Sequence, residues 1–124
     1  MTTVQGFRFS GRIRSFVHAG RGIRTMLASQ HNAWIHGFAT LVVAIAGVVL
    51  QISAVSWCVL VLAVTSVWVA EAMNTAFEFL CDVASPEFHP LVKKSKDVAA
   101  GAVLLSALGA SIVGIIVFAP YLWR

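Results

Sequence analysis

The strongest limit on the fold of this chain comes from long stretches that contain no charged side chain. They cover residues 33–50, 57–70 and 98–122, and the second continues directly into a helical segment that ends near residue 82. Such stretches favour hydrocarbon over water, and a backbone in hydrocarbon must satisfy its hydrogen bonds internally, as a helix does. A hydrophobic content of 59% and a mean hydropathy of +0.86 are too high for a typical soluble domain.

We therefore predict an all-α integral membrane protein with a single domain. That domain would cover residues 1–124, with transmembrane helices over residues 33–50, 56–82 and 95–119. Residues 83–92 contain a Ser-Pro and a His-Pro step, which predict a loop. Cys58 and Cys81 fall on the same predicted helix, roughly 35 Å apart by helical rise, so they cannot form a disulfide with each other.

The segment before the first transmembrane stretch has a different pattern. Over residues 7–29, apolar side chains recur at steps of three and four, and arginines fill the other directions. This pattern is typical of an amphipathic helix that lies on an anionic membrane surface, although Gly11, Gly20 and Gly22 weaken it and could break it. Five of the nine basic residues lie in this segment, so the charge indicates a membrane surface rather than a nucleic acid partner.

Charges near the ends of the predicted spans indicate the orientation of the chain. The arginine-rich segment and the lysines Lys93, Lys94 and Lys96 fall on the same side if the chain crosses the membrane three times. The positive-inside rule places that side in the cytoplasm. The second transmembrane helix ends on this side, so we expect the carboxylates at its end to face the cytoplasm.

The end of the second transmembrane helix carries a polar stripe. At about 100° per residue, Glu71, Asn74, Glu78 and Asp82 share one side of a helix, with Thr75 beside them. Carboxylates on a helix that emerges from hydrocarbon are costly, so they indicate function by default. For Asp82, near the exit, a helix end wetted by water and headgroups is a fair alternative.

Carboxylates and lysines at one membrane surface suit phosphoryl transfer, although the chain has no Walker loop, kinase catalytic-loop motif or zinc-site spacing. Glu71 lies deepest and suits a general base, and Glu78, two turns nearer the water, suits a magnesium ligand. Asn74 lies between them and can orient either. From the residues alone, a proton relay or an ion path remains an open alternative.

Two sequence motifs resemble those of a known family. Residues 71–82, with Glu71, Asn74, Glu78 and Asp82, resemble the signature E-x-x-N-[ST]-A-[IF]-E-x-x-x-D of the small prokaryotic diacylglycerol kinase and undecaprenol kinase family. Lys96-Asp97-Val-Ala-Ala-Gly-Ala-Val resembles the family's K-D-x-A-A-A/G-A-V element.

Two further stretches extend this resemblance to most of the chain, from Arg14 to Phe118. Glu87-Phe-His-Pro-Leu is similar to the family's loop, and residues 15–23, Ser-Phe-Val-His-Ala-Gly-Arg-Gly-Ile, are similar to the undecaprenol kinase branch in particular.

The resemblance implies a homotrimer with active sites between subunits, in the bacterial inner membrane and open to the cytoplasm. It also implies a magnesium-dependent kinase that moves the γ-phosphate of ATP to a membrane lipid alcohol. Undecaprenol is the favoured substrate and diacylglycerol the alternative. A homologue that has lost its catalytic activity and serves as a scaffold is a third interpretation.

The same resemblance assigns roles to individual residues. Glu71 and Asn74 fall on catalytic positions, with Glu71 the base that meets the lipid hydroxyl. Glu78 falls on a metal ligand, and Arg24 falls near the part of the surface helix that contacts the lipid. The positions that face the nucleotide are Lys96, Asp97, Glu87, His89, His18 and Asp82.

One position departs from the family pattern. Many members carry glutamate as a second metal ligand where this chain has Gln30, in a pattern like E-x-N-x-x-x-H. An amide oxygen can coordinate magnesium but brings no charge, so we predict weaker metal binding, or a metal held mostly by ATP and Glu78. His31 and His36, at the entrance of the first transmembrane helix, are interpreted as interfacial residues.

Overall fold

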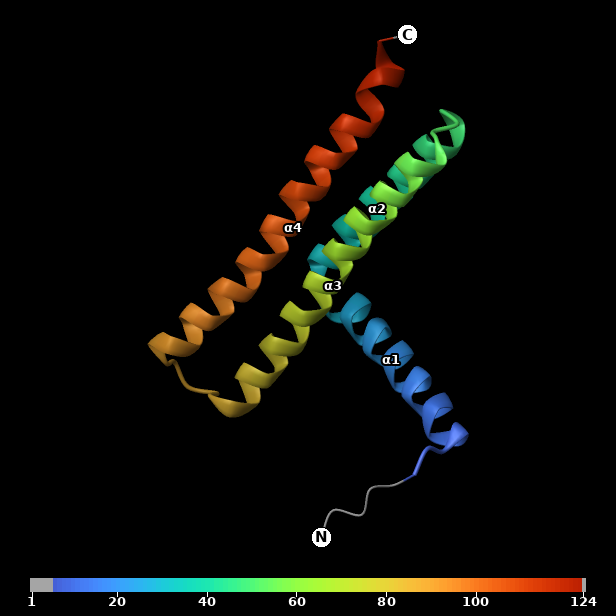
Figure 1. Ribbon diagram of the computed structural model, residues 1–124. Helices are drawn as coiled ribbons and strands as arrows, with labels where there is room; N and C mark the ends of the chain where they lie inside the picture. The colour runs from blue at the N-terminus through green and yellow to red at the C-terminus, as the bar shows by residue number, and fades with distance from the viewer. Residues whose placement is uncertain (1–5, 124) are drawn as a thin grey trace.

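The computed structural model describes residues 6–123, and these residues form four helices (Figure 1). The helices are α1 (Phe9–Ser29), α2 (His31–Val49), α3 (Ala54–Ala84) and α4 (Pro90–Leu122). Helices α2, α3 and α4 are each long and apolar enough to cross a membrane. The prediction of an all-α protein with three candidate spans is therefore confirmed.

Helix α1 contacts α2 and α3 but diverges from the other three helices in Figure 1. It is continuous through its glycines, so the break that they could have caused does not occur. Met26 is buried, whereas Phe9 and Phe16 are largely exposed. The chain turns from α1 into α2 at Gln30, whose backbone is extended. A helix that diverges from the others and exposes aromatic side chains suits the predicted position on a membrane surface.

A tight turn joins α2 to α3. The backbone N–H of Ile52 donates to the carbonyl of Gly47 at 3.2 Å, and that of Gln51 donates to Val48 at 3.3 Å. Gln51 has a φ of 51°, so the chain reverses through the left-handed conformation that ends many helices. Gly47 is needed here, because a Cβ on it would lie 2.6 Å from the ring of Trp57.

The loop between α3 and α4 is shorter than predicted. Helix α3 continues to Ala84 and α4 begins at Pro90, which leaves residues 85–89 rather than 83–92 between them. Proline suits the first turn of a helix, where its missing N–H is not needed. The ring of His89 also caps α4, since its Nδ1 accepts a hydrogen bond from the backbone N–H of Leu91 at 3.2 Å. These two features start the helix before the lysines.

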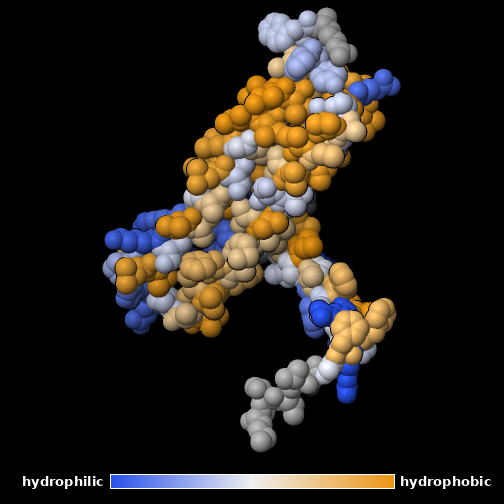
Figure 2. All heavy atoms as spheres, in the orientation of Figure 1, coloured by the Kyte–Doolittle hydropathy of each residue, from blue (hydrophilic) through white to orange (hydrophobic). Residues whose placement is uncertain are grey.

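Few side chains are buried between the helices, and many large apolar ones are exposed. Helices α3 and α4 run side by side for most of their length (Figure 1). Figure 2 shows an apolar surface over the body of the molecule, with hydrophilic groups where α3 meets α4 and on α1. A surface of this kind fits hydrocarbon, because lipid does not penalise exposed apolar side chains.

Candidate active site

The polar stripe of α3 is buried at its deep end. Glu71 is completely buried, and Asn74 and Thr75 are 6% and 3% exposed. Thr75 is satisfied within its own helix, since its hydroxyl donates to the carbonyl of Glu71 at 2.9 Å. Both carboxylate oxygens of Glu71 and Oδ1 of Asn74 have no hydrogen-bond partner among the described residues. Because unpaired buried polar atoms are costly and rare, they point to a functional site.

A histidine from α2 lies against this buried carboxylate. Nε2 of His36 is 3.5 Å from Oε2 of Glu71, without hydrogen-bond geometry. The histidine ring contacts the ring of Trp68 edge-on, with centroids 6.2 Å apart. Trp68 in turn donates from Nε1 to the hydroxyl of Thr40 at 3.1 Å. His36 is therefore held in place beside Glu71.

The sequence-based interpretation of His36 as an interfacial residue missed this contact. The His36 side chain is 15% exposed and contacts Glu71 on α3. A signal was available, since His36 ends the same seven-residue pattern in which Gln30 replaces glutamate. The pairing itself depends on how α2 packs on α3, which the spacing of residues does not reveal.

The two predicted metal ligands meet in the structure. Nε2 of Gln30, at the junction of α1 and α2, donates to Oε2 of Glu78 on α3 at 2.9 Å. These residues are 48 positions apart in the chain, so their contact depends on the tertiary fold. Among residues 6–123, no group of three or more His, Cys, Asp and Glu side chains could hold a metal ion.

Two ion pairs lie at the outer end of the stripe. Nζ of Lys96 on α4 is 2.9 Å from Oδ1 of Asp82 on α3. Within α4, Nζ of Lys93 is 2.7 Å from Oδ2 of Asp97. The structure thus gathers three of the predicted nucleotide-binding residues, Asp82, Lys96 and Asp97, where α3 and α4 meet.

The remaining predicted residues, Glu87, His89, His18 and Arg24, are exposed. Glu87 and His89 belong to the loop between α3 and α4, and the hydroxyl of Ser85 donates to the carbonyl of Glu87 at 3.1 Å. His18 and Arg24 are exposed on α1. Among residues 6–123, no hydrogen bond or ion pair joins the side chain of His18 or Arg24 to the α3 stripe, so their predicted roles stay predictions.

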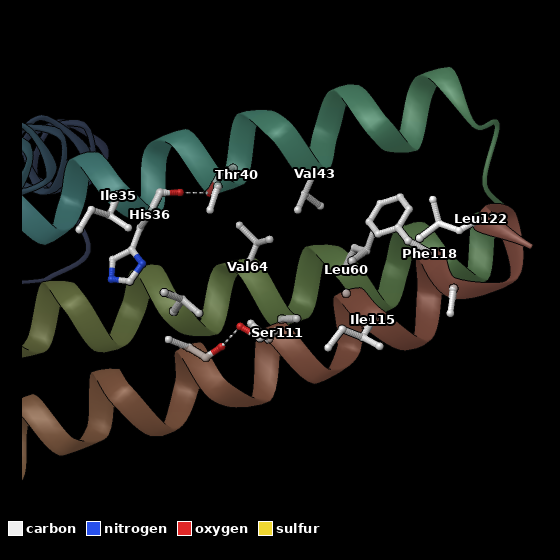
Figure 3. Close-up of a pocket in the computed structure, with 17 residues that line it drawn as sticks. Ile35, His36, Thr40, Val43, Leu60, Val64, Ser111, Ile115, Phe118 and Leu122 are labelled. Carbon is white, nitrogen blue, oxygen red and sulfur yellow. Dashed lines mark hydrogen bonds between the residues drawn. The ribbon is translucent and has the colours of Figure 1, made fainter.

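An apolar groove with a volume of about 600 Å³ runs along the three long helices. Figure 3 shows His36 at one end and Phe118 and Leu122 at the other. Val67 also lines the groove, and Glu71 follows it by one helical turn on α3. The groove therefore leads toward the buried carboxylate.

A helical membrane protein with one completely buried carboxylate, Glu71, and with lysines in ion pairs at one end has the features of an integral-membrane phosphotransferase. The family model described as prokaryotic diacylglycerol kinase matches residues 17–118. The chain belongs to this family of lipid kinases, as the sequence motifs predicted.

Individual relatives carry two different names. Undecaprenol kinase of Bacillus subtilis is 38% identical over 109 residues, which are 88% of this chain and 89% of that protein. A diacylglycerol kinase of Synechocystis is 41% identical over 101 residues, 81% of this chain but 58% of that protein. Diacylglycerol kinase of Escherichia coli K12 is 27% identical over 115 residues, 93% of this chain and 91% of that protein.

Proposed function

We propose that this protein is an ATP-dependent kinase that transfers the γ-phosphate to the hydroxyl of undecaprenol at the cytoplasmic face of the bacterial inner membrane. The observation that carries the proposal is Glu71, whose completely buried carboxylate has two unpartnered oxygens beside an apolar groove. A lipid hydroxyl at this point can donate to the carboxylate while its hydrocarbon chain occupies the groove. The substrate hydroxyl then supplies a hydrogen-bond partner for the Glu71 carboxylate, which has none among the described residues.

In this mechanism Glu71 acts as the general base. Its carboxylate takes the proton of the lipid hydroxyl as the lipid oxygen bonds to the γ-phosphorus and the bond to the β-phosphate oxygen breaks, which releases ADP. Asn74 lies one turn farther along the same face, and its unpartnered Oδ1 can accept a hydrogen bond from a substrate group. The lysines where α3 and α4 meet, Lys96 above all, neutralise charge on the phosphates of ATP.

The residues present fit a magnesium ion bound next to the phosphates. Glu78 and Gln30 are in contact, and rotation of the Gln30 amide would turn its oxygen toward the same point as the carboxylate. Hard oxygen ligands suit magnesium, which usually takes only one or two from protein and the rest from phosphates and water. When bound, the metal would neutralise charge on the phosphates.

Undecaprenol is favoured over diacylglycerol for two reasons. The Bacillus subtilis undecaprenol kinase matches along nearly its whole length, whereas the Synechocystis diacylglycerol kinase matches over 58% of its length. Residues 15–23 also resemble the undecaprenol kinase branch. Diacylglycerol remains the second candidate because its kinases also match this chain. We expect the enzyme to act as a homotrimer, as the family resemblance implies.

The test is phosphate transfer from γ-labelled ATP in mixed micelles that contain magnesium and either undecaprenol or diacylglycerol. We expect labelled undecaprenyl phosphate, and little or no labelled phosphatidic acid. Preferred labelling of diacylglycerol would correct the substrate but keep the kinase. If gel filtration shows that the protein is folded and assembled, absence of label in both samples would overturn the catalytic proposal and favour the scaffold interpretation.

A further inference from the structure

We propose that His36 is a positioning residue that holds the Glu71 carboxylate in the orientation needed for catalysis. Its Nε2–H would donate a hydrogen bond to Oε2 of Glu71 and leave Oε1 free to receive the proton of the lipid hydroxyl. This inference rests on the proposed role of Glu71 as the base. It adds a residue that, from its position at the entrance of the first transmembrane helix, was interpreted as interfacial.

The first argument is that the buried carboxylate of Glu71 needs a hydrogen-bond donor, and that His36 lies close enough to be that donor. The carboxylate is completely buried, and both of its oxygens are unpartnered among the described residues. Nε2 of His36 is also buried and unpartnered, and it lies 3.5 Å from Oε2. A small rotation of the Glu71 carboxylate would align the two groups, and catalytic hydrogen bonds are often long before substrate binds.

The second argument is that the surroundings of His36 fix its ring. The edge of the ring packs against Trp68, and Trp68 is tied by its Nε1 to the hydroxyl of Thr40. Thr40 donates that hydroxyl to the carbonyl of His36 at 2.6 Å. These contacts join α2 to α3 and fix the His36 ring before substrate binds, so binding need not order that side chain. A preoriented donor of this kind is effective because it need not reorganise during the reaction.

The third argument concerns which oxygen remains available. A carboxylate that is free to rotate presents either oxygen in many directions, and most of these do not face the substrate. If His36 holds Oε2, the other oxygen has a single direction. Since His36 also lines the apolar groove, the same side chain would contact the lipid near its hydroxyl.

The experiment compares two substitutions at His36 in the full-length protein. His36→Phe keeps a flat ring against Trp68 but has no donor, whereas His36→Gln places an amide N–H near the position of Nε2. We expect His36→Phe to lower kcat by about 10- to 100-fold, the effect of losing one hydrogen bond to a charged group. The KM for ATP should stay within about twofold, since a hydrogen bond to the base affects proton transfer and not nucleotide binding.

His36→Gln should recover most of the lost kcat. Trp68→Phe tests the support of the ring, because it keeps an aromatic edge against His36 and removes the bond to Thr40. We expect it to lower kcat by less than His36→Phe does. Equal loss in the Phe and Gln variants, or an unchanged kcat in the Phe variant, would overturn the inference while wild-type activity still supports the kinase. An inactive wild-type protein would instead refute the proposed function.

A spectroscopic measurement keeps the inference testable if the His36 variants fail to fold. Nitrogen-15 NMR of labelled histidine distinguishes the two neutral tautomers, and the chain contains only four histidines. We expect the His36 signal to show the proton on Nε2 and to shift in the Glu71→Gln variant. A proton on Nδ1, or a signal that does not respond to Glu71→Gln, would overturn the inference.

Discussion

The polar groups at the two ends of the α3 stripe differ in exposure and in whether they have partners. At the outer end, Asp82 and Lys96 form an ion pair at 2.9 Å with their side chains 65% and 37% exposed. At the inner end, Glu71 is completely buried, and its oxygens are unpartnered among the described residues. Exposed pairs contribute little to stability, whereas a buried unpaired charge is a substantial cost. The most costly polar group of the stripe is therefore Glu71 at its inner end, where the proposed function places the lipid hydroxyl.

The comparison teaches that satisfied polar groups are weak evidence of function in this protein. The pairs at the outer end are what any wet helix end would form. At the inner end, Nε2 of His36, both carboxylate oxygens of Glu71 and Oδ1 of Asn74 form no hydrogen bond among the described residues. Buried polar atoms without partners are often completed by a ligand, and this is the reason for proposing the active site at these three residues.

The largest expected effect comes from Glu71→Gln. Loss of the general base should lower kcat by about 10²- to 10⁴-fold. The variant should be at least as stable as the wild type, because the carboxylate that it replaces has no hydrogen-bond partner among the described residues. Parallel measurement of turnover and of thermal unfolding in detergent tests both parts. A variant that loses activity only because it unfolds would contradict the contrast between the two ends.

A smaller effect is expected from Gln30→Glu, which would place a second carboxylate against Glu78. The magnesium concentration for half-maximal rate should fall by about tenfold, because an anion replaces a neutral ligand beside a dication. In the absence of magnesium the variant should unfold at a lower temperature than the wild type, and added magnesium should restore it. Thermal unfolding at several magnesium concentrations provides this readout without turnover.

Gln30→Leu is the matched control for that prediction, since it can neither coordinate a metal nor donate to Glu78. We expect it to need more magnesium than the wild type. If Gln30→Glu and wild type share the same magnesium dependence of both rate and unfolding, Gln30 and Glu78 do not form a metal site.

The buried amide of Asn74 should affect turnover more than stability. Asn74→Leu removes an amide whose Oδ1 is unpartnered and adds apolar contacts at a nearly closed position. We expect stability to change by no more than about 1 kcal/mol or to rise, since no satisfied bond is lost. Turnover should nevertheless fall by about tenfold or more if Asn74 accepts a hydrogen bond from substrate. A large loss of stability with normal turnover would show that Asn74 is structural.

The smallest effect on stability is expected at the outer end. Asp82→Asn breaks the pair with Lys96 and should change the free energy of unfolding by less than about 1 kcal/mol, because both groups remain hydrated. Raising the salt concentration should reduce even this difference. Titration of unfolding with a denaturing detergent at two salt concentrations measures it. A loss of several kcal/mol would remove the distinction between the two ends.

The amino-acid sequence predicted the fold class well because the bilayer leaves few choices. Uncharged stretches in hydrocarbon must be helical, and the three stretches became α2, α3 and α4. The spacing of Glu71, Asn74, Glu78 and Asp82 was enough to place them on one side of α3, since helical periodicity is local. The start of α4 was predicted too late, because the cap made by His89 and Pro90 was interpreted only as part of a loop.

By itself, the sequence determined which groups belong to one helix and which family the chain resembles. Only the tertiary structure decided that Gln30 meets Glu78, that Lys96 meets Asp82 and that His36 rests against Glu71. Each of these contacts joins two different helices, so each depends on how those helices pack against one another. Helical periodicity places residues around a single axis and carries no information about the distance or angle to the next one.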